Sequence, residues 1–336
     1  MNVVFYIKIN VTSIYLYMST VGLTNLGNTC FINVCIQLLY AIPELAYIQN
    51  NNNNSLLHAL QKFNAFLSEQ RRRQTKQISP DWFVRIVKSV ANQKHADFAS
   101  YGQADMTEFF AFLLDEFHMS LVRPYSMDPP DINTLHPLAK SCFEFVKQDY
   151  SKDYSEIKEL FYGIIVSEIR TPTHTRFLPP EMFGSLHVEI KGSIYDCLDD
   201  FFSDERIEGE NALLNETTGI KEDIIKGTCV WNFPKILIIS IQRVHNSSRN
   251  KNDTAIHYPI DGLDLQKYVS GFSPEKYVYD LFGVCLHHGQ VNYGHYTAFV
   301  RLQQDWYHYN DHLVTPVKNI NDIVSPYAYS LFYRRK

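Results

Sequence analysis

The chain has 336 residues, of which 45% are apolar and 14% aromatic, so it can bury a substantial hydrophobic core. Its 31 basic and 36 acidic side chains give a net charge of -5 and form no sustained basic stripe, which argues against nucleic acid as the main partner. The six cysteines form no CxxC pair and no dense regular spacing. Such a pattern favours a reducing, intracellular location, in the cytoplasm, the nucleus or both.

The first 21 residues are interpreted as an N-terminal extension. Their apolar run is interrupted by Asn2, Lys8 and Asn10, and neither a membrane-spanning length nor a small-residue cleavage site follows. We therefore expect no signal peptide and no membrane partner. Because Met18 opens a compact approach to the first motif, the extension is either an added strand or upstream sequence that the fold does not need.

Helical patterns dominate the chain to about residue 160, and the clearest cover residues 30–40 and 105–119. The Asn50–Asn54 and Arg71–Arg73 runs lie between them and are interpreted as solvated loop or helix surface, with little expectation of function. From residue 161 the pattern changes to short β-rich runs divided by Gly, Pro, Asn and Asp. These runs are FYGIIVSEI, SLHVEI, KILIISIQRV, YDLFGVCLHH, HYTAFVRL and DWYHYN.

A helical first part packed on an antiparallel sheet predicts an α+β fold, with the active site in the cleft between the two.

The segment around Cys30 has the features of a nucleophile site. The apolar residues that follow recur at helical spacing and place Cys35 in the core; they are Phe31, Val34, Cys35, Leu38 and Leu39. Cys30 begins this helix and shares the opposite, polar face with Asn33 and Gln37. The positive end of the helix macrodipole favours a thiolate there. A lone cysteine is more often a small buried thiol, so the interpretation needs a partner base.

The loop before Cys30 can support such chemistry. Gly22 and Gly27 allow the backbone to approach closely, and the side chains of Asn25 and Asn28 carry amide donors suited to an oxyanion.

The partner base is expected at His295, which begins an alternating strand after a glycine-containing loop. A turn near Gln303 returns the chain to Asn310 and Asp311, so either side chain can reach the imidazole and fix its tautomer. A Cys-His-Asn triad results. The rival bases are interpreted as loop or rim residues; they are His287 and His288.

These segments resemble the ubiquitin-specific proteases, which are cysteine deubiquitinases of papain-like architecture. GLTNLGNTCFIN is similar to the family's cysteine box, and HHGQVNYGHYTAFV followed by WYHYND is similar to its histidine box. Between them, YGQADMTEFFAFLLDEF resembles its glutamine-rich helix motif, with Ala104 and Met106 in place of a usual Gln and Ala. FPKILIISIQRV and IHYPIDGLDL resemble its sheet strands. The resemblance implies one catalytic domain over residues 22–336, with a helical thumb to residue 160 and a sheet-rich palm and fingers after it.

The resemblance also implies a role for each site residue. Cys30 would attack, His295 would act as the base, Asn310 would orient it, and Asn25 would help to hold the oxyanion. Asp311 would be a supporting polar group and is the second choice for the orienting residue. No cofactor is required.

By resemblance, a further set of residues would bind the tail of ubiquitin; it comprises Gln103, Asp105, Glu108 and Tyr296. Asp105 and Glu108 also fit a local explanation, because D-x-x-E before an apolar run resembles a helix capping box. Both explanations can hold. Glycines near the cleft suit a substrate that ends in Gly-Gly.

The resulting expectation is a thiol peptidase that releases ubiquitin from proteins or opens its chains through an acyl-enzyme at Cys30. The alternatives are a ubiquitin-binding protein without catalysis and a peptidase for a ubiquitin-like modifier. The intact set of Cys30, His295, Asn310 and Asn25 argues against loss of catalysis.

The fingers are expected to be free of metal. Most relatives carry two CxxC pairs there for a structural zinc, and the corresponding positions fall at Thr171, His174, Asn215 and Thr218. One histidine with three weak oxygen or amide groups does not make a closed zinc site. We predict no tightly bound zinc, and metal analysis after gentle purification tests this, since one zinc per chain would contradict it.

Overall fold

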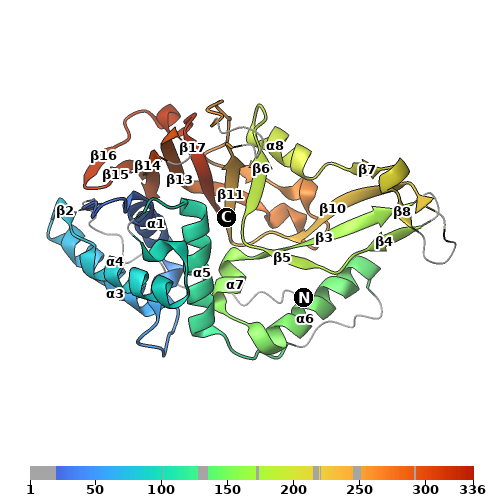
Figure 1. Ribbon diagram of the computed structural model, residues 1–336, viewed down its shortest axis with the longest axis horizontal. Helices are drawn as coiled ribbons and strands as arrows, with labels where there is room; N and C mark the ends of the chain where they lie inside the picture. The colour runs from blue at the N-terminus through green and yellow to red at the C-terminus, as the bar shows by residue number, and fades with distance from the viewer. Residues whose placement is uncertain are drawn as a thin grey trace. The chain divides into compact units, whose positions relative to one another are not determined.

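The structure is a computed structural model that describes residues 20–100, 102–127, 135–171, 174–214, 219, 221–244, 251–290 and 293–336 (Figure 1). These residues form two compact units. The first unit comprises the described residues up to Ser120 together with Cys285–Ile323, and the second comprises Leu121–Val284 with Val324–Lys336. Within the described ranges, none of the helices combines the length and apolar character that a membrane crossing requires.

The first unit packs helices against an antiparallel sheet. Its helices are α1 (Cys30–Tyr40), α2 (Glu44–Tyr47), α3 (Leu56–Arg72), α4 (Asp81–Gln93), the 3-10 turns Asp97–Ala99 and Ile320–Ile323, and α5 (Met106–Leu121), whose last residue belongs to the second unit. Its strands run in the order β13-β14-β15-β16. They are β14 (Tyr293–Leu302), β15 (Asp305–Asn310), β16 (Leu313–Pro316) and the end of β13 (Val278–Gln290). A separate parallel pair joins β1 (Gly22–Leu23) to β2 (Gln77–Ile78).

The second unit is richer in strands. Its helices are α6 (Pro137–Asp153), α7 (Glu156–Phe161), α8 (Ile194–Phe201) and the 3-10 turns Gly209–Asn211, Gln266–Tyr268 and Pro274–Lys276. One sheet has the order β4-β3-β10-β7, with β5 also paired to β3. Its strands are β3 (Gly163–Arg170), β4 (Thr175–Phe177), β5 (Glu181–Phe183), β7 (Glu205–Ile207) and β10 (Ile224–Asn232). The small pair β8 (Leu213–Leu214) and β9 (Lys221–Glu222) stands apart from it.

The other strands of the second unit continue from the start of β13. Their order is β13-β17-β11-β6, with β12 also paired to β13. The strands are β6 (Leu186–Glu189), β11 (Ile236–Gln242), β12 (Leu263–Asp264) and β17 (Ala328–Arg335). β11 is antiparallel to β17 and parallel to β6. The expected α+β class is therefore confirmed, and the six strand-like runs of the sequence become β3, β6, β11, β13, β14 and β15.

Helix α1 is more deeply buried than its amphipathic pattern suggests. All eleven of its residues are buried, Cys35 among them as predicted. The polar face of α1 is buried as well. There the Asn33 amide donates to the Leu23 carbonyl at 3.3 Å, and the Gln37 amide donates to the Val21 carbonyl at 3.0 Å. Hydrogen bonds to the chain before Cys30 thus make the burial of this polar face tolerable.

The two polar runs of the first unit, Asn50–Asn54 and Arg71–Arg73, differ in how far they are exposed to solvent. Residues 51–54 are exposed, as expected for a solvated loop. Arg72 and Arg73 are exposed too, and both pair with Glu69. The expectation of a solvated surface was wrong for Arg71, which is only 1% exposed. Because Arg71 follows the buried Leu67 by four residues, it continues the inward stripe of α3.

Gly22 is placed where a side chain cannot fit. A Cβ atom there would lie 2.1 Å from the carbonyl oxygen of His312, and the neighbouring Leu23 amide donates to the Asp311 carbonyl at 2.9 Å. We predict that Gly22→Ala lowers the free energy of unfolding by about 1–3 kcal/mol, because backbone must shift to relieve the overlap. Chemical denaturation measures this. Gly102→Ala is the control, since its Cβ would meet only the flexible Ser100 side chain; equal losses in both variants would refute the explanation.

Candidate active site

The loop before α1 is shaped by its own side chains. Gly27 and Asn28 both have positive φ, at 96° and 53°. The Asn25 side-chain oxygen accepts from the Gly27 amide at 2.9 Å and from the Thr29 amide at 3.2 Å, which closes the loop. Cys30 then begins α1 and is 4% exposed. Its thiol therefore lies at the positive end of the helix in a nearly dry setting.

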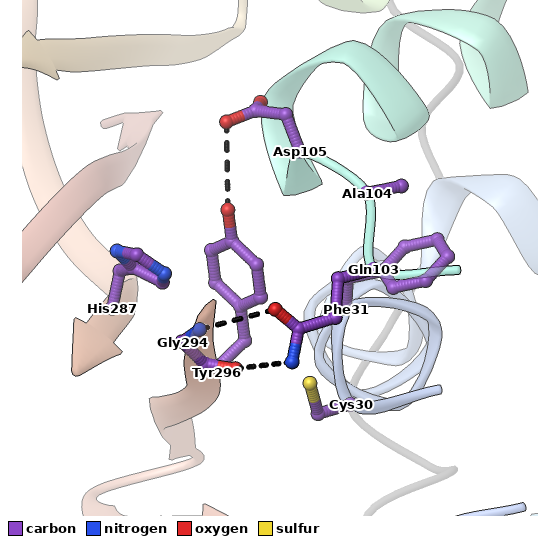
Figure 2. A pocket seen from close by; sticks show the side chains of 8 residues that line it. All are labelled: Cys30, Phe31, Gln103, Ala104, Asp105, His287, Gly294 and Tyr296. Carbon is purple, nitrogen blue, oxygen red and sulfur yellow. Dashed lines mark hydrogen bonds between the residues drawn. The ribbon is translucent and has the colours of Figure 1, made fainter. Parts of the chain in front are cut away.

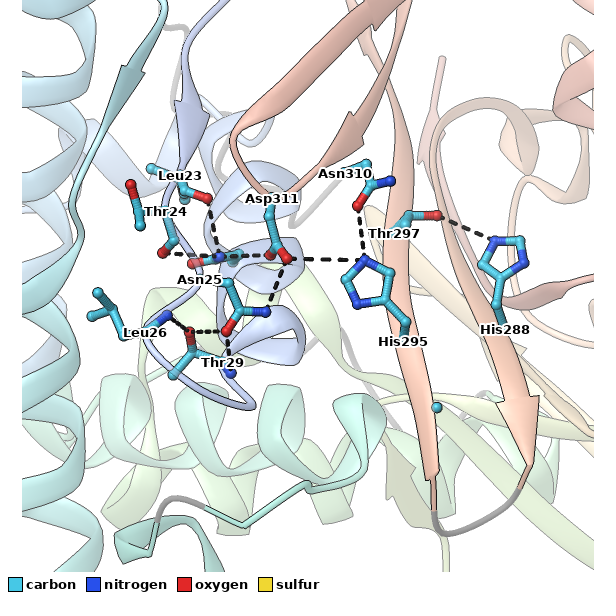
Figure 3. A network of polar contacts seen from close by, with 12 residues as sticks. Leu23, Thr24, Asn25, Leu26, Thr29, His288, His295, Thr297, Asn310 and Asp311 are labelled. Carbon is cyan, nitrogen blue, oxygen red and sulfur yellow. Dashed lines mark hydrogen bonds and ion pairs between the residues drawn. The ribbon is translucent and has the colours of Figure 1, made fainter.

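His295 and Asn310 are brought together by the β14–β15 hairpin (Figure 3). The distance from His295 Nε2 to Asn310 Oδ1 is 2.8 Å. Since an amide oxygen can only accept, Nε2 carries the hydrogen. The lone pair of the neutral ring then lies on Nδ1, which is the nitrogen that can take a proton from a thiol.

The electrostatics of His295 favour its protonated form. A hydrogen bond with the Cys30 side chain, above all, raises the pKa of His295 to about 9 from its ordinary value of 6.5. The hydrogen bond with Asn310 and the charges of Cys30 and Asp311 act in the same direction, while burial opposes them. The imidazole is therefore well matched to hold a proton that comes from Cys30.

Asp311 connects three segments of the site. Its Oδ2 accepts from the Asn25 amide at 2.9 Å (Figure 3). Its Oδ1 accepts from the Asn33 amide at 2.8 Å. The distance from Oδ2 to His295 Nε2 is 3.9 Å. Of the two candidates for the orienting residue, Asn310 is thus the one in hydrogen-bond contact with the imidazole.

A pocket of about 380 Å³ opens beside Cys30 (Figure 2). Its lining residues are Cys30, Phe31, Gln103, Ala104, Asp105, His287, Gly294 and Tyr296. The Gln103 side chain donates to the Gly294 carbonyl at 3.2 Å and accepts from its amide at 3.1 Å. The Tyr296 hydroxyl donates to Asp105 Oδ2 at 3.4 Å. Three of the four residues expected to bind substrate therefore line one pocket.

Asp105 also caps α5. Its Oδ1 accepts from the Thr107 amide at 2.7 Å and from the Glu108 amide at 3.1 Å. The explanation of Asp105 as a helix cap therefore holds for its Oδ1, while its Oδ2 accepts from the Tyr296 hydroxyl in the pocket. Glu108 itself is exposed and is not among the lining residues.

The interpretation of His287 and His288 as loop or rim residues was wrong. Both lie within β13, and His287 is buried with its ring 4.6 Å from that of Tyr296 (Figure 2). A Cβ on Gly294 would lie 1.9 Å from His287 Nε2, so only glycine fits beside this ring. The run YDLFGVCLHH already contained both histidines, but β13 continues to Gln290 instead of ending at them. The alternation of YDLFGVCLHH, followed to its last residue, could have placed His287 on the inward face.

The expected metal-free positions are only partly described. Thr171 Oγ1 and His174 Nδ1 are 2.9 Å apart, while Asn215 and Thr218 lie outside the described residues. Across the described ranges, no group of three or more His, Cys, Asp or Glu side chains is arranged to hold a metal ion. All six cysteines are described, and each is a free thiol.

Comparison with known proteins decides the family. Residues 21–333 match the sequence profile described as ubiquitin carboxyl-terminal hydrolase. The chain belongs to this family. The resemblance to the ubiquitin-specific proteases is thereby confirmed, and the match covers both compact units.

Curated relatives of this hydrolase family cover almost the whole chain. Ubiquitin carboxyl-terminal hydrolase 21 of Bos taurus is 28% identical over 94% of this chain and 61% of its own length. Ubiquitin carboxyl-terminal hydrolase 3 of Homo sapiens is 28% identical over 93% of this chain and 67% of its own. The chain thus spans about three fifths to two thirds of the length of these relatives.

Solved structures show the same fold. The SAGA DUB module of Ubp8, Sgf11, Sus1 and Sgf73 bound to monoubiquitin contains a chain that matches with a TM-score of 0.71 and 24% identity, over 94% of this hydrolase-family chain and 69% of that one. The same module bound to ubiquitin aldehyde matches with a TM-score of 0.69 at 24% identity, over 94% and 69% of the two chains.

The contact with Cys30 should be visible in the titration of His295. We predict an imidazole midpoint near pH 9 by NMR, and a lower midpoint in Cys30→Ala, which removes the largest upward contribution. Because the folded-state pKa is raised, the linked stability is fully present below pH 6.5 and is lost as the pH rises through about 9. Cys35→Ala, a core variant, should leave the midpoint unchanged. An unchanged midpoint in Cys30→Ala would contradict the assignment.

Proposed function

We propose that this protein is a thiol deubiquitinase, which hydrolyses the bond after the C-terminal glycine of ubiquitin in conjugates or chains. The observation that carries the proposal is the arrangement of a cysteine at a helix start, a histidine whose pKa that cysteine raises, and an asparagine 2.8 Å from the histidine. Family membership supports the substrate class. The ubiquitin-bound state of the solved modules supports it further.

The reaction uses the side chains in sequence. His295 Nδ1 takes the thiol proton of Cys30, and the sulfur forms a bond to the carbonyl carbon of the terminal glycine. The tetrahedral intermediate collapses as the amine leaves with the proton from His295, which yields a thioester. Water then gives a proton to His295 and attacks the thioester, and the sulfur recovers that proton as it leaves. Asn310 keeps the imidazole in one tautomer throughout.

Asn25 is the proposed oxyanion donor. Its amide nitrogen carries two hydrogens, and the bond to Asp311 uses one of them. The second hydrogen can therefore stabilise the negative charge that develops on the carbonyl oxygen. Such a donor typically contributes a factor of about 10²–10³ to the rate.

The pocket beside Cys30 is the proposed passage for the ubiquitin tail. Gln103, Asp105 and Tyr296 line it, and the carboxylate of Asp105 can attract a basic side chain of the substrate. Glu108 would add a negative charge at the exposed start of α5. We place this activity in one catalytic domain over residues 22–336, in the cytoplasm or nucleus, where free thiols persist.

A ubiquitin carrying a C-terminal electrophile tests the proposal. Wild-type protein should gain the mass of one ubiquitin, and Cys30→Ala should gain none. Cys229→Ala is the matched control, because Cys229 is the most accessible of the other thiols and should not matter. Loss of labelling of about 10²-fold or more is expected for His295→Gln.

The same experiment separates the alternatives. Tight binding of ubiquitin without labelling would make the protein a binding module and would overturn the proposal. Labelling by the electrophile of a ubiquitin-like modifier, and not by that of ubiquitin, would change the substrate class.

A further inference from the structure

Arg71 is a cation in the interior of the first unit. It is the last residue but one of α3, yet only 1% of the residue is exposed. Arg72 and Arg73, by contrast, reach solvent with side chains 69% and 66% exposed. Burial of a guanidinium is costly unless strong contacts compensate for it. The partners of Arg71 therefore indicate what the buried charge does.

Two elements that carry the candidate active site supply partners of Arg71. Arg71 Nη2 donates to Gln37 Oε1 at 3.3 Å and to the Tyr309 hydroxyl at 3.4 Å. Its guanidinium carbon lies 3.8 Å from the centre of the Tyr40 ring, a cation–π distance. Gln37 and Tyr40 belong to α1, and Tyr309 belongs to β15.

Each of these elements presents one member of the proposed triad. Gln37 follows Cys30 by seven residues, about two turns, and so lies on the same face of α1. Tyr309 directly precedes Asn310 in β15. Arg71 makes both hydrogen bonds through Nη2 while its planar guanidinium lies over the Tyr40 ring, and the compact ammonium of a lysine does not reproduce this combination. Burial raises the pKa of Tyr309 to about 12, and the positive charge of Arg71 opposes this shift. This opposition agrees with a guanidinium close to the Tyr309 hydroxyl.

We propose that Arg71 is a positioning residue for the reaction. It fixes α1 against β15 so that the side chains of Cys30 and Asn310 can both contact the imidazole of His295. The catalytic consequence rests on the proposed function. The positioning itself does not, because the pKa of His295 reports the contacts of the imidazole with Cys30 and Asn310 whether or not ubiquitin is cleaved.

Tyr309→Phe tests the contact between Arg71 and β15 with the smallest change, since it removes one hydroxyl and keeps the ring. We expect kcat on a fluorogenic C-terminal amide of ubiquitin to fall by about 3- to 10-fold, with KM within about twofold. We also expect the NMR midpoint of His295 to move down from about 9. Arg71→Met should show larger effects in the same directions, and Arg71→Lys should restore only part of them.

Tyr40→Phe is the matched control. It also removes a buried phenolic hydroxyl from the neighbourhood of Arg71, but that hydroxyl bonds Ser68 at 2.9 Å, and the ring under the guanidinium remains. Its kcat and its His295 midpoint should equal those of the wild type.

The outcomes are distinguishable. If Arg71→Met does not fold, Tyr309→Phe still decides the question. A lower melting temperature in Tyr309→Phe with unchanged kcat and unchanged His295 midpoint would show a purely structural role and overturn the proposal, as would equal effects in Tyr40→Phe. If the wild type does not cleave ubiquitin, the proposed function fails, and the His295 midpoint in the variants alone decides whether Arg71 positions the site.

Discussion

The carboxylate of Asp311 is the point at which the separate pieces of the site are joined. It accepts one amide hydrogen from Asn25 and one from Asn33, so it holds the loop before Cys30 and the helix that Cys30 begins. The backbone carbonyl of Asp311 also accepts from the Leu23 amide at 2.9 Å. Because both side-chain bonds involve a charged acceptor in a partly buried setting, they are stronger than bonds between neutral groups. The proposed nucleophile and the proposed base come from distant parts of the chain, and these bonds help to fix their separation.

Asn310 and Asp311 are adjacent, yet they serve different segments. Asp311 has a φ of 49°, in the left-handed region, and this turn directs its side chain toward the start of α1 while Asn310 faces His295. Aspartate adopts that conformation at less cost than most residues. The end of β15 and the turn that follows it thus supply both the residue in hydrogen-bond contact with the imidazole and the residue that anchors the loop before Cys30.

The sequence predicts whatever depends on local periodicity. The stripe after Cys30 gave α1, and alternation around His295 gave β14, the turn and β15, which together bring Asn310 to the imidazole. Periodicity says little about a polar residue whose partners are distant. Arg71 looked like part of a charged surface because its partners Gln37 and Tyr309 are 34 and 238 residues away. Likewise, alternation can assign His287 to the inward face, but one strand alone cannot reveal that its ring lies against Tyr296 of a neighbouring strand.

The charges around His295 explain why a neutral amide suits position 310. The imidazolium would already face the sulfur of Cys30 and, at 3.9 Å, the carboxylate of Asp311, and its pKa is raised to about 9. A second carboxylate in contact with Nε2 would favour the charged ring still more. In the proposed reaction, His295 must later return its proton to the leaving amine, and this step becomes harder as the proton is held more tightly. Asn310 accepts from Nε2 without adding charge, and so in the proposed role it would orient the imidazole while keeping the proton transferable.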